Sequence, residues 1–277
     1  MQIDFNNKVY TGSNGRQSLM DCRIPDDAKG VIVFAHGYKG YKDWGAWQLM
    51  ENAFIAAGFG FVKFNMTHNG GTVEQPIDFP DLQAFGENCY SYELFDLNLI
   101  IEETDRILRQ ELASSIPVYL MGHSRGGGVS VLVAAQQPIV QKVISLAGIS
   151  DIATRFPTGD ALLDWQIDGV YYVQNGRTMK EMPHFYSFYE DFKENEAALN
   201  IEEAAGNLKV PFLQIHGDMD LAVSISEGLK VAQWTDTRVS IIKGAGHTFG
   251  AVHPWTEKEL PADLLEVVNR AIDFFEN

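Results

Sequence analysis

Residues 118–132 have the sequence VYLMGHSRGGGVSVL. Within this stretch, GHSRG (122–126) matches the pattern G-x-S-x-G, which is weak by itself because glycine and serine share many turns. The pattern gains weight where a strand precedes the serine and a helix follows it. The apolar run 118–121 predicts the strand, and the small and apolar residues from Arg125 predict a buried helix. The stretch therefore indicates an α/β fold with Ser124 at a strand-to-helix corner.

The glycines on either side of the serine have a physical reason. A residue at such a corner adopts a strained backbone conformation, which is tolerated only where no side chains crowd it. Gly122 and Gly126 leave that space free, so the hydroxyl of Ser124 is exposed at a helix N-terminus. Because a helix N-terminus stabilises developing negative charge, we identify Ser124 as the candidate nucleophile.

Short β-rich runs alternate with helical patterns along the rest of the chain. Continuous apolar runs are typical of strands that are covered on both faces, as in a parallel sheet. The alternation of strand and helix predicts a doubly wound α/β fold. The predicted core strands are 31–37, 59–65, 117–123, 142–148, 211–217 and 238–244, and the predicted helices are about 43–57, 91–112, from Arg125, from about Ser224, and from Ala262 to the end.

The N-terminal region differs from this pattern. Residues 9–24, VYTGSNGRQSLMDCRI, predict two strands that turn at Ser13-Asn14-Gly15. We expect them to form an antiparallel addition at the edge of the sheet. Together with the six core strands they predict an eight-stranded, mostly parallel α/β sheet.

One long segment, 151–207, contains no run that resembles a core strand, although βα connections usually need only a few residues. The segment is rich in aromatic residues, and Asn175-Gly176 between two β-like runs predicts a hairpin. We interpret it as a cap inserted after the sixth strand of an α/β core formed by 1–150 and 208–277. The alternative is an edge extension with no role at a site. Candidate substrate contacts from the cap are Trp165, Tyr171 and Tyr172.

A serine hydroxyl is a poor nucleophile unless a base accepts its proton, and a carboxylate should orient that base. His247, in KGAGHTF, follows the last predicted strand, where it can reach the carboxyl edge of the sheet. His253 is the alternative base, although its neighbour Pro254 favours a surface turn.

The candidate acids follow predicted strands at the same edge of the sheet, where sites in open α/β sheets lie. The sequence HGDMD offers Asp218 and Asp220. Asp220 is favoured as the orienting acid, whereas Asp218 is expected to hold its loop through backbone hydrogen bonds. Asp151, after strand 142–148, is a third candidate.

A tetrahedral intermediate also needs hydrogen-bond donors for its oxyanion. The backbone N–H of Arg125, directly after the nucleophile, is one candidate donor. The loop after the first core strand contains His36-Gly37-Tyr38, and the N–H of Tyr38 is the second candidate.

With these motifs in place, the chain resembles the α/β-hydrolase family. FAHGYKGYKDWG, GHSRGG, HGDMD and GAGH are similar to the oxyanion loop, nucleophile elbow, acid turn and histidine loop of that family. The predicted hairpin after the sixth strand is most similar to the feruloyl or cinnamoyl esterase branch. The resemblance implies that Ser124 is the nucleophile, His247 the base and Asp220 the orienting acid, that the amides of Tyr38 and Arg125 are the oxyanion donors, and that no cofactor is needed.

The motifs together predict a serine hydrolase that cleaves carboxylic esters through an acyl-enzyme intermediate, with a small to medium, apolar or aromatic acyl group. The same residues could serve a thioesterase, a small-peptide hydrolase or an acyltransferase. A non-catalytic binding protein on a hydrolase scaffold would be expected to lack one of the motifs, and none is missing. The connection 66–91 is longer than a minimal loop and can line the pocket, which leaves the substrate open.

The composition of the chain indicates which partners and which compartment to expect. The chain has 21 basic and 37 acidic residues and a net charge of -16, which disfavours nucleic acids and anionic membrane surfaces. No secretory leader and no apolar run of about 18 residues is visible, which favours a cytoplasmic protein without a membrane span. Cys22 and Cys89 match no metal or redox spacing, so we expect two buried thiols and no metal. The expected partner is a small-molecule ester, and the oligomeric state is left open.

Overall fold

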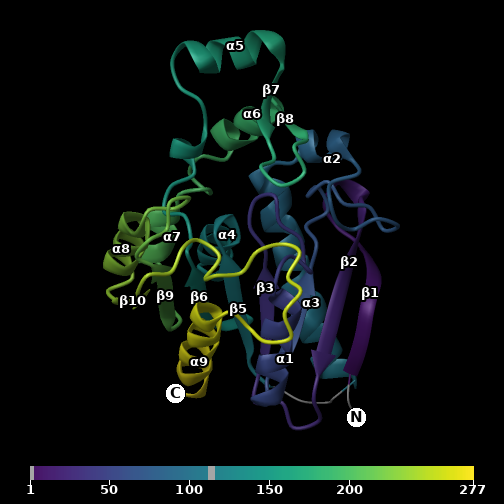
Figure 1. Ribbon diagram of the computed structural model, residues 1–277, viewed down its shortest axis with the longest axis vertical. Coiled ribbons are helices and arrows are strands. Elements are labelled where there is room, and N and C mark those ends of the chain that lie inside the picture. Colours follow the sequence, from purple (N-terminus) through teal and green to yellow (C-terminus); the bar gives the residue numbers. More distant parts are fainter. Residues whose placement is uncertain (1–2, 112–115) are drawn as a thin grey trace.

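A computed structural model of the 277-residue chain describes residues 3–111 and 116–277. Among these residues, eight strands form one sheet in the spatial order β1-β2-β4-β3-β5-β6-β9-β10 (Figure 1). The predicted mostly parallel eight-stranded sheet is thereby confirmed. The strands are β1 (Ile3–Thr11), β2 (Gln17–Ile24), β3 (Val31–Ala35), β4 (Gly60–Phe64), β5 (Val118–His123), β6 (Val140–Leu146), β9 (Phe212–Gly217) and β10 (Val239–Ile242).

The two N-terminal strands form the antiparallel edge of the sheet, as predicted. β2 pairs antiparallel with both β1 and β4, whereas β3 pairs parallel with β4 and β5. The turn between β1 and β2 is a short 3-10 helix, Ser13–Gly15, in which Asn14 adopts a left-handed conformation with φ 51°. The order of the strands reverses between β3 and β5, and such a reversal is where open α/β sheets bind ligands.

Helices cover both faces of the sheet because its strands are apolar on both faces. In β3, Val31 and Val33 belong to one core cluster, and Ile32 and Phe34 belong to the other. The first cluster includes residues of α3 (Tyr90–Glu111), α4 (Arg125–Ala134), α7 (Ile201–Gly206) and α8 (Ile225–Trp234), and the second includes α1 (Trp47–Ala56) and α9 (Ala262–Glu276).

Five of these helices, α1, α3, α4, α8 and α9, agree with the predicted ones, whereas α7 lies in segment 151–207, where no helix was predicted. The last residue of the predicted helix 91–112 lies outside the described residues. None of the helices in the described ranges has both the length and the apolar character that crossing a membrane requires. Both cysteines, Cys22 and Cys89, are buried.

Segment 151–207 contains η2 (Ala153–Arg155), α5 (Asp160–Asp168), β7 (Val170–Gln174), β8 (Glu181–Phe185), α6 (Ser187–Glu194) and α7. β7 and β8 form a separate two-stranded antiparallel sheet, so the hairpin predicted at Asn175-Gly176 is present. The connection, residues 175–180, is longer than a two-residue turn, and within it the side chain of Asn175 accepts hydrogen bonds from the backbone of Arg177 and Thr178. α5, the β7–β8 hairpin and α6 project beyond one end of the main sheet (Figure 1), whereas α7 packs beside α4 and α8.

A buried group of charges near β4 was not predicted from the sequence. Lys63, on β4, is fully buried, and its Nζ lies 2.7 Å from Asp43 and 2.9 Å from Glu51. Lys42 is also buried, with its Nζ 2.7 Å from Asp21. A charge is tolerated in the interior only when partners replace its hydration, so these ion pairs link the loop after β3 to β2, β4 and α1.

Candidate active site

Ser124 stands at a sharp corner between β5 and α4. Its backbone has φ 58° and ψ -120°, a conformation that side-chain-bearing residues rarely adopt. The neighbouring glycines make the corner sterically feasible. A Cβ added to Gly122 would lie 2.1 Å from the carbonyl oxygen of Gly126, and one added to Gly126 would lie 2.4 Å from the carbonyl oxygen of Ala35.

Loops from two distant parts of the chain bring His247 and Asp220 to this corner. Nε2 of His247 lies 2.9 Å from Oγ of Ser124, and Nδ1 of His247 lies 2.7 Å from Oδ2 of Asp220. Asp220 follows β9, and His247 follows β10, the neighbouring strand. The three side chains therefore form a continuous hydrogen-bonded series at the carboxyl ends of parallel strands.

The other oxygen of the Asp220 carboxylate is also engaged. Oδ1 accepts hydrogen bonds from the backbone N–H groups of Ala222 and Val223, at 2.8 and 2.9 Å. Burial would raise the pKa of Asp220, but hydrogen bonds from His216, His247 and Val223 outweigh burial and hold this pKa well below its usual range. Asp220 is therefore ionised at neutral pH and fixed toward His247.

The alternative acids and the alternative base make other contacts. Oδ1 of Asp218 accepts a hydrogen bond from the backbone N–H of Gly244 at 2.5 Å, which holds the two loops together. Oδ1 of Asp151 accepts one from Thr154 N–H at 3.3 Å. Nδ1 of His253 accepts one from Gly45 N–H at 2.9 Å. Only His247 and Asp220, of these candidates, are hydrogen-bonded in series with Ser124 in the described part of the chain.

Two further histidines support the site as neutral side chains. Nε2 of His123 lies 2.9 Å from the carbonyl oxygen of His247, and Nε2 of His36 accepts a hydrogen bond from Met66 N–H at 3.1 Å. Burial lowers the pKa of His123 to about 3 and that of His36 to about 4. Both imidazoles are therefore uncharged near neutrality and hold loops in place.

The loop after β3 runs directly against Ser124. A Cβ added to Gly37 would lie 2.9 Å from Cβ of Ser124, so only glycine permits this approach. The next residue, Tyr38, is one candidate oxyanion donor. Arg125 contributes the first amide of α4, where an α-helix supplies no acceptor of its own.

The side chains of the two candidate donors are packed on each other. The guanidinium of Arg125 lies 4.4 Å from the ring centroid of Tyr38, and its Nη1 lies 3.0 Å from Oε1 of Glu93. The hydroxyl of Tyr38 lies 2.7 Å from Nε2 of His184, on β8. These contacts connect the loop after β3, the start of α4 and the β7–β8 hairpin, which fixes the two amides relative to each other.

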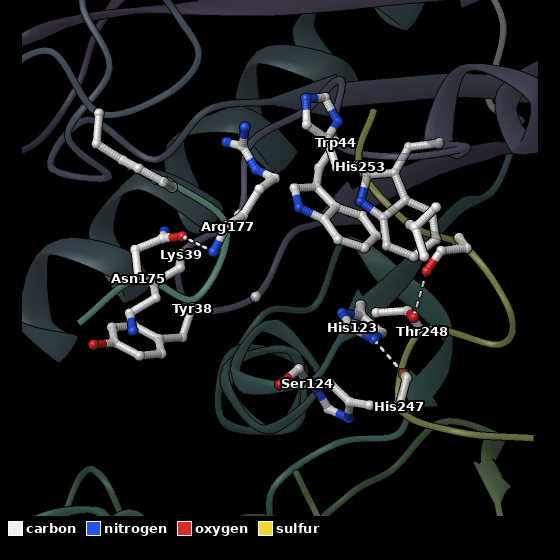
Figure 2. Close-up of a pocket in the computed structure, with 16 residues that line it drawn as sticks. Tyr38, Lys39, Trp44, His123, Ser124, Asn175, Arg177, His247, Thr248 and His253 are labelled. Atoms are coloured by element: carbon white, nitrogen blue, oxygen red, sulfur yellow. Dashed lines mark hydrogen bonds between the residues drawn. The ribbon is translucent and has the colours of Figure 1, made fainter. Parts of the chain in front are cut away.

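Two cavities meet at Ser124 and His247. The first, of about 440 Å³, includes Trp44, Trp47 and Phe79, and the second, of about 430 Å³, includes aromatic residues of α3, β7 and α6. In Figure 2, Tyr38, Lys39, Asn175 and Arg177 lie on one side of the first cavity, with Trp44 and His253 on the opposite side. Ser124 therefore has space on both sides, as the two halves of an ester or amide substrate require.

The predicted substrate contacts differ in their placement. Tyr171 lines the second cavity. Trp165 does not line either cavity: it is 1% exposed, and its indole N–H donates to the carbonyl of His184, so it forms the core of segment 151–207. Tyr172 is 58% exposed and points away, because neighbouring residues of a strand face opposite sides.

Several lining residues were missed from the sequence. Trp44 and Trp47 line the first cavity. They belong to the stretch DWGAW, which was interpreted only as the start of a predicted helix. Phe79 comes from the long connection 66–91, which does reach the first cavity, as the sequence allowed. Tyr90, from the same connection, and Phe188, from the aromatic-rich segment 151–207, line the second cavity, although neither was singled out as a substrate contact. Within residues 3–111 and 116–277, no cluster of three His, Cys, Asp or Glu side chains suited to a metal is found.

Comparison with known proteins agrees with this architecture. The fold is that of the α/β hydrolases, and structural similarity extends over nearly the whole chain. The sequence pattern of the prolyl oligopeptidase family matches residues 83–266, more than half of the chain and a range that includes Ser124, Asp220 and His247. The chain therefore belongs to the prolyl oligopeptidase family. The resemblance to α/β hydrolases expected from the motifs is confirmed.

Two solved structures illustrate the similarity. Est1E from Butyrivibrio proteoclasticus, with ferulic acid bound, is 18% identical with a TM-score of 0.70, covering 97% of this chain and 98% of that one. The α/β hydrolase GrgF from Penicillium sp. sh18 is 14% identical with a TM-score of 0.71, covering 100% and 98%. At such identities the shared property is the fold.

Two curated relatives, both from Mycobacterium tuberculosis, carry the name "Putative phosphoribosyl transferase". Each is 26% identical over 140 residues, which is 50% of this chain and 28% of the relative. The match thus covers less than a third of the relatives' length.

Proposed function

We propose that this protein is a serine hydrolase that cleaves carboxylic esters through an acyl-enzyme intermediate. The observation that carries the proposal is the hydrogen-bonded series Ser124–His247–Asp220 at the junction of two cavities. A base in contact with the serine hydroxyl, and an acid in contact with the base, are what nucleophilic attack by serine requires.

In the first half of the reaction, Oγ of Ser124 attacks the ester carbonyl while Nε2 of His247 accepts the hydroxyl proton. The resulting tetrahedral intermediate collapses, the bond to the alcohol oxygen breaks, and His247 returns the proton to the departing alcohol. In the second half, a water molecule gives a proton to His247 and attacks the acyl-enzyme. Collapse of this second intermediate releases the acid and restores the Ser124 hydroxyl.

Asp220 remains an anion throughout this cycle. Its contact with Nδ1 of His247, 2.7 Å long, selects the tautomer with a free Nε2 and stabilises the imidazolium that forms after attack. The low pKa of Asp220 supports this role, because the carboxylate stays charged at neutral pH.

The backbone amides of Tyr38 and Arg125 are the proposed oxyanion donors. The approach of Gly37 to Ser124 and the position of Arg125 as the first helical residue support this assignment. Each such donor contributes about 3 kcal/mol to stabilisation of the transition state in related chemistry.

An apolar or aromatic acyl group fits the cavities best. Aromatic side chains occur in both, Trp44, Trp47 and Phe79 in the first and Tyr90, Tyr171 and Phe188 in the second. The β7–β8 hairpin and α6 supply part of the second cavity, which supports a cap role for this segment.

The direct test is burst hydrolysis of 4-nitrophenyl esters from acetate to octanoate, together with a feruloyl ester. We expect the wild type to release about one equivalent of nitrophenol per site in the burst. Ser124→Ala should abolish the burst, whereas Ser226→Ala, a serine at the start of α8, should retain it. Equal background rates in the wild type and a folded Ser124→Ala variant would refute the proposal.

A second candidate, hydrolysis of small peptides, is favoured by membership of the prolyl oligopeptidase family. The same three side chains can act on an amide, so the two functions differ in rate on matched substrates. Comparison of alanyl and prolyl 4-nitroanilides with the corresponding 4-nitrophenyl esters distinguishes them. The protein is a peptidase if the ratio of its rate on the anilide to its rate on the ester exceeds the same ratio for the uncatalysed reactions.

A further inference from the structure

The charges around the two cavities are opposite to the charge of the whole protein. The chain has a net charge of -16, yet none of the described residues that line either cavity is Asp or Glu. The cations there are Lys39 and Arg177 in the first cavity, and Lys39, Arg125 and Arg155 in the second. Lys39 is thus the cation that lines both.

The arginines of the cavities are already neutralised by carboxylates behind the walls. Arg125 forms an ion pair with Glu93, Arg155 with Glu227, and Arg177 with Asp78. Each guanidinium therefore offers little net charge to a ligand, because its own counterion is in contact with it.

Lys39 differs from these arginines. Among the described residues, no carboxylate forms an ion pair with its Nζ, which donates a hydrogen bond to the carbonyl of Gln174 at 3.0 Å. An ammonium group can donate three hydrogen bonds, so donors remain for a ligand. The side chain also lies beside the Tyr38 ring, with Nζ 5.0 Å from the ring centroid.

The backbone of Lys39 adds an independent observation. Its φ is 55°, in the left-handed region that disfavours a residue with a side chain. Lysine occupies this position, in the loop that approaches Ser124, although glycine would be accommodated without strain. Such strain is typical of functional sites, where the surrounding structure maintains it. Burial is the main cause that lowers the pKa of Lys39, Arg125 adds to it and Glu181 opposes it, so the surroundings compensate this ammonium group incompletely.

We propose that Lys39 binds a carboxylate of the substrate, so that the protein prefers esters bearing a negative charge over their neutral counterparts. The inference rests on the proposed ester hydrolysis and names its substrate class. One ammonium matches one carboxylate in charge, which favours a carboxylate over a doubly charged phosphate. Because Lys39 lines both cavities, the carboxylate can belong to the acyl half or to the alcohol half of the ester.

Two pairs of esters distinguish a carboxylate in the acyl half from a carboxylate in the alcohol half. The acyl pair is mono-4-nitrophenyl glutarate and its methyl-capped, neutral form, and the alcohol pair is 4-acetoxybenzoate and methyl 4-acetoxybenzoate. The members of a pair differ in intrinsic reactivity, so the quantity compared is the ratio of their kcat/KM values in each protein. We expect Lys39→Met, which keeps the chain length without the charge, to lower this ratio by about tenfold in one pair, as for loss of a charged hydrogen bond.

Matched variants make the result specific. Lys39→Arg should restore most of the ratio, and Lys243→Met, which removes an exposed lysine at the end of β10, should leave it unchanged. If Lys39→Met lowers kcat/KM for both members of each pair equally, the residue only holds the hairpin through Gln174, and the inference is wrong.

A binding measurement separates failure of this inference from failure of the proposed function. Calorimetry should give an affinity for 4-hydroxybenzoate about tenfold above that for 4-hydroxybenzamide, and the difference should disappear in Lys39→Met. If the protein hydrolyses esters but prefers the charged member neither in the two ester pairs nor in calorimetry, the carboxylate site is refuted and the proposed ester hydrolysis is not. Absence of Ser124-dependent hydrolysis would refute the proposed function, and the calorimetric comparison would still decide whether Lys39 selects an anion.

Discussion

The hydroxyl of Tyr38 and Nε2 of His184 lie 2.7 Å apart, joining the loop beside Ser124 to strand β8 of the hairpin. Burial, together with the charges of Arg125 and Lys39, lowers the pKa of His184 to about 3. The imidazole is therefore neutral near pH 7, and an unprotonated Nε2 can accept a hydrogen bond from the Tyr38 hydroxyl. Through this contact, the β7–β8 hairpin helps to position Tyr38, whose backbone amide is a proposed oxyanion donor.

Tyr38→Phe tests this connection. Removing the hydroxyl leaves His184 without its partner, so we expect the free energy of unfolding to fall by about 1 kcal/mol. A less constrained loop should also lower kcat severalfold with little change in KM, because the amide of Tyr38 is a proposed oxyanion donor and would act on the transition state. Denaturant titration and ester kinetics measure the two effects. Tyr172→Phe, on the exposed side of the same hairpin, serves as control, and an equal effect there would contradict the prediction.

Asp220→Asn tests the proposed role of Asp220 as the orienting acid. The amide keeps the shape of the side chain but favours the wrong tautomer of His247, and we expect kcat to fall by about 10⁴-fold. The matched control is Asp218→Asn, two residues away, whose carboxylate accepts a hydrogen bond from Gly244 and does not contact His247. A comparable loss of kcat in both variants would mean that the loop, and not the acid, is required.

Acidification should destabilise the protein through its buried histidines. Burial lowers the pKa of His123 and His184 to about 3 and that of His36 to about 4, below the unfolded value of about 6.5. Between these values the unfolded chain binds more protons, so the free energy of unfolding decreases as pH falls from about 6.5 toward 4. For three such groups the slope reaches at most about 4 kcal/mol per pH unit.

The contribution of a single histidine can be isolated. His184→Gln keeps an acceptor for Tyr38 but does not titrate, so its slope over this window should be shallower by about 1.4 kcal/mol per pH unit. Urea unfolding at half-unit steps of pH provides the measurement. Parallel slopes for the wild type and the variant would show that His184 is protonated in the folded state.

Lys63→Met tests the buried charges near β4. Removing this lysine takes a cation from Asp43 and from the buried Glu51, which keep Lys42 and Arg23 as their remaining cationic partners, and we expect the protein to lose about 3 kcal/mol of stability. Lys63→Met combined with Glu51→Leu should recover part of the loss, because the buried carboxylate that loses its lysine partner is removed as well. Thermal and urea unfolding report both variants. A single variant as stable as the wild type would show that water reaches these groups.

Much of the fold could be predicted because it depends on patterns that are local in the chain. Continuous apolar runs of four to six residues predicted the buried strands, and the residues around Ser124 predicted the corner between β5 and α4. The candidate acids and bases were also located, because residues at the carboxyl ends of parallel strands share one edge of the sheet. The choice of Asp220 over Asp218 and Asp151 stays a functional prediction, supported by its contact with His247.

The cavity walls could not be predicted in the same way. Trp165, Tyr171 and Tyr172 are all aromatic residues of segment 151–207, and the sequence does not distinguish them. Their different roles follow from the packing of α5 against the hairpin and from the alternation of side chains along β7. One is buried inside the segment, one faces a cavity and one faces solvent.

The sequence by itself therefore determined the α/β sheet and its antiparallel edge, since each depends on residues close together in the chain. It also indicated the candidates Ser124, Asp220 and His247, because each lies in a short motif directly after a predicted strand. Only the tertiary structure decided which cations near Ser124 are neutralised. Arg125 meets Glu93 from 32 positions away, and Tyr38 meets His184 from 146 positions away. Such contacts arise when helices and loops pack on the sheet, and no local pattern encodes them.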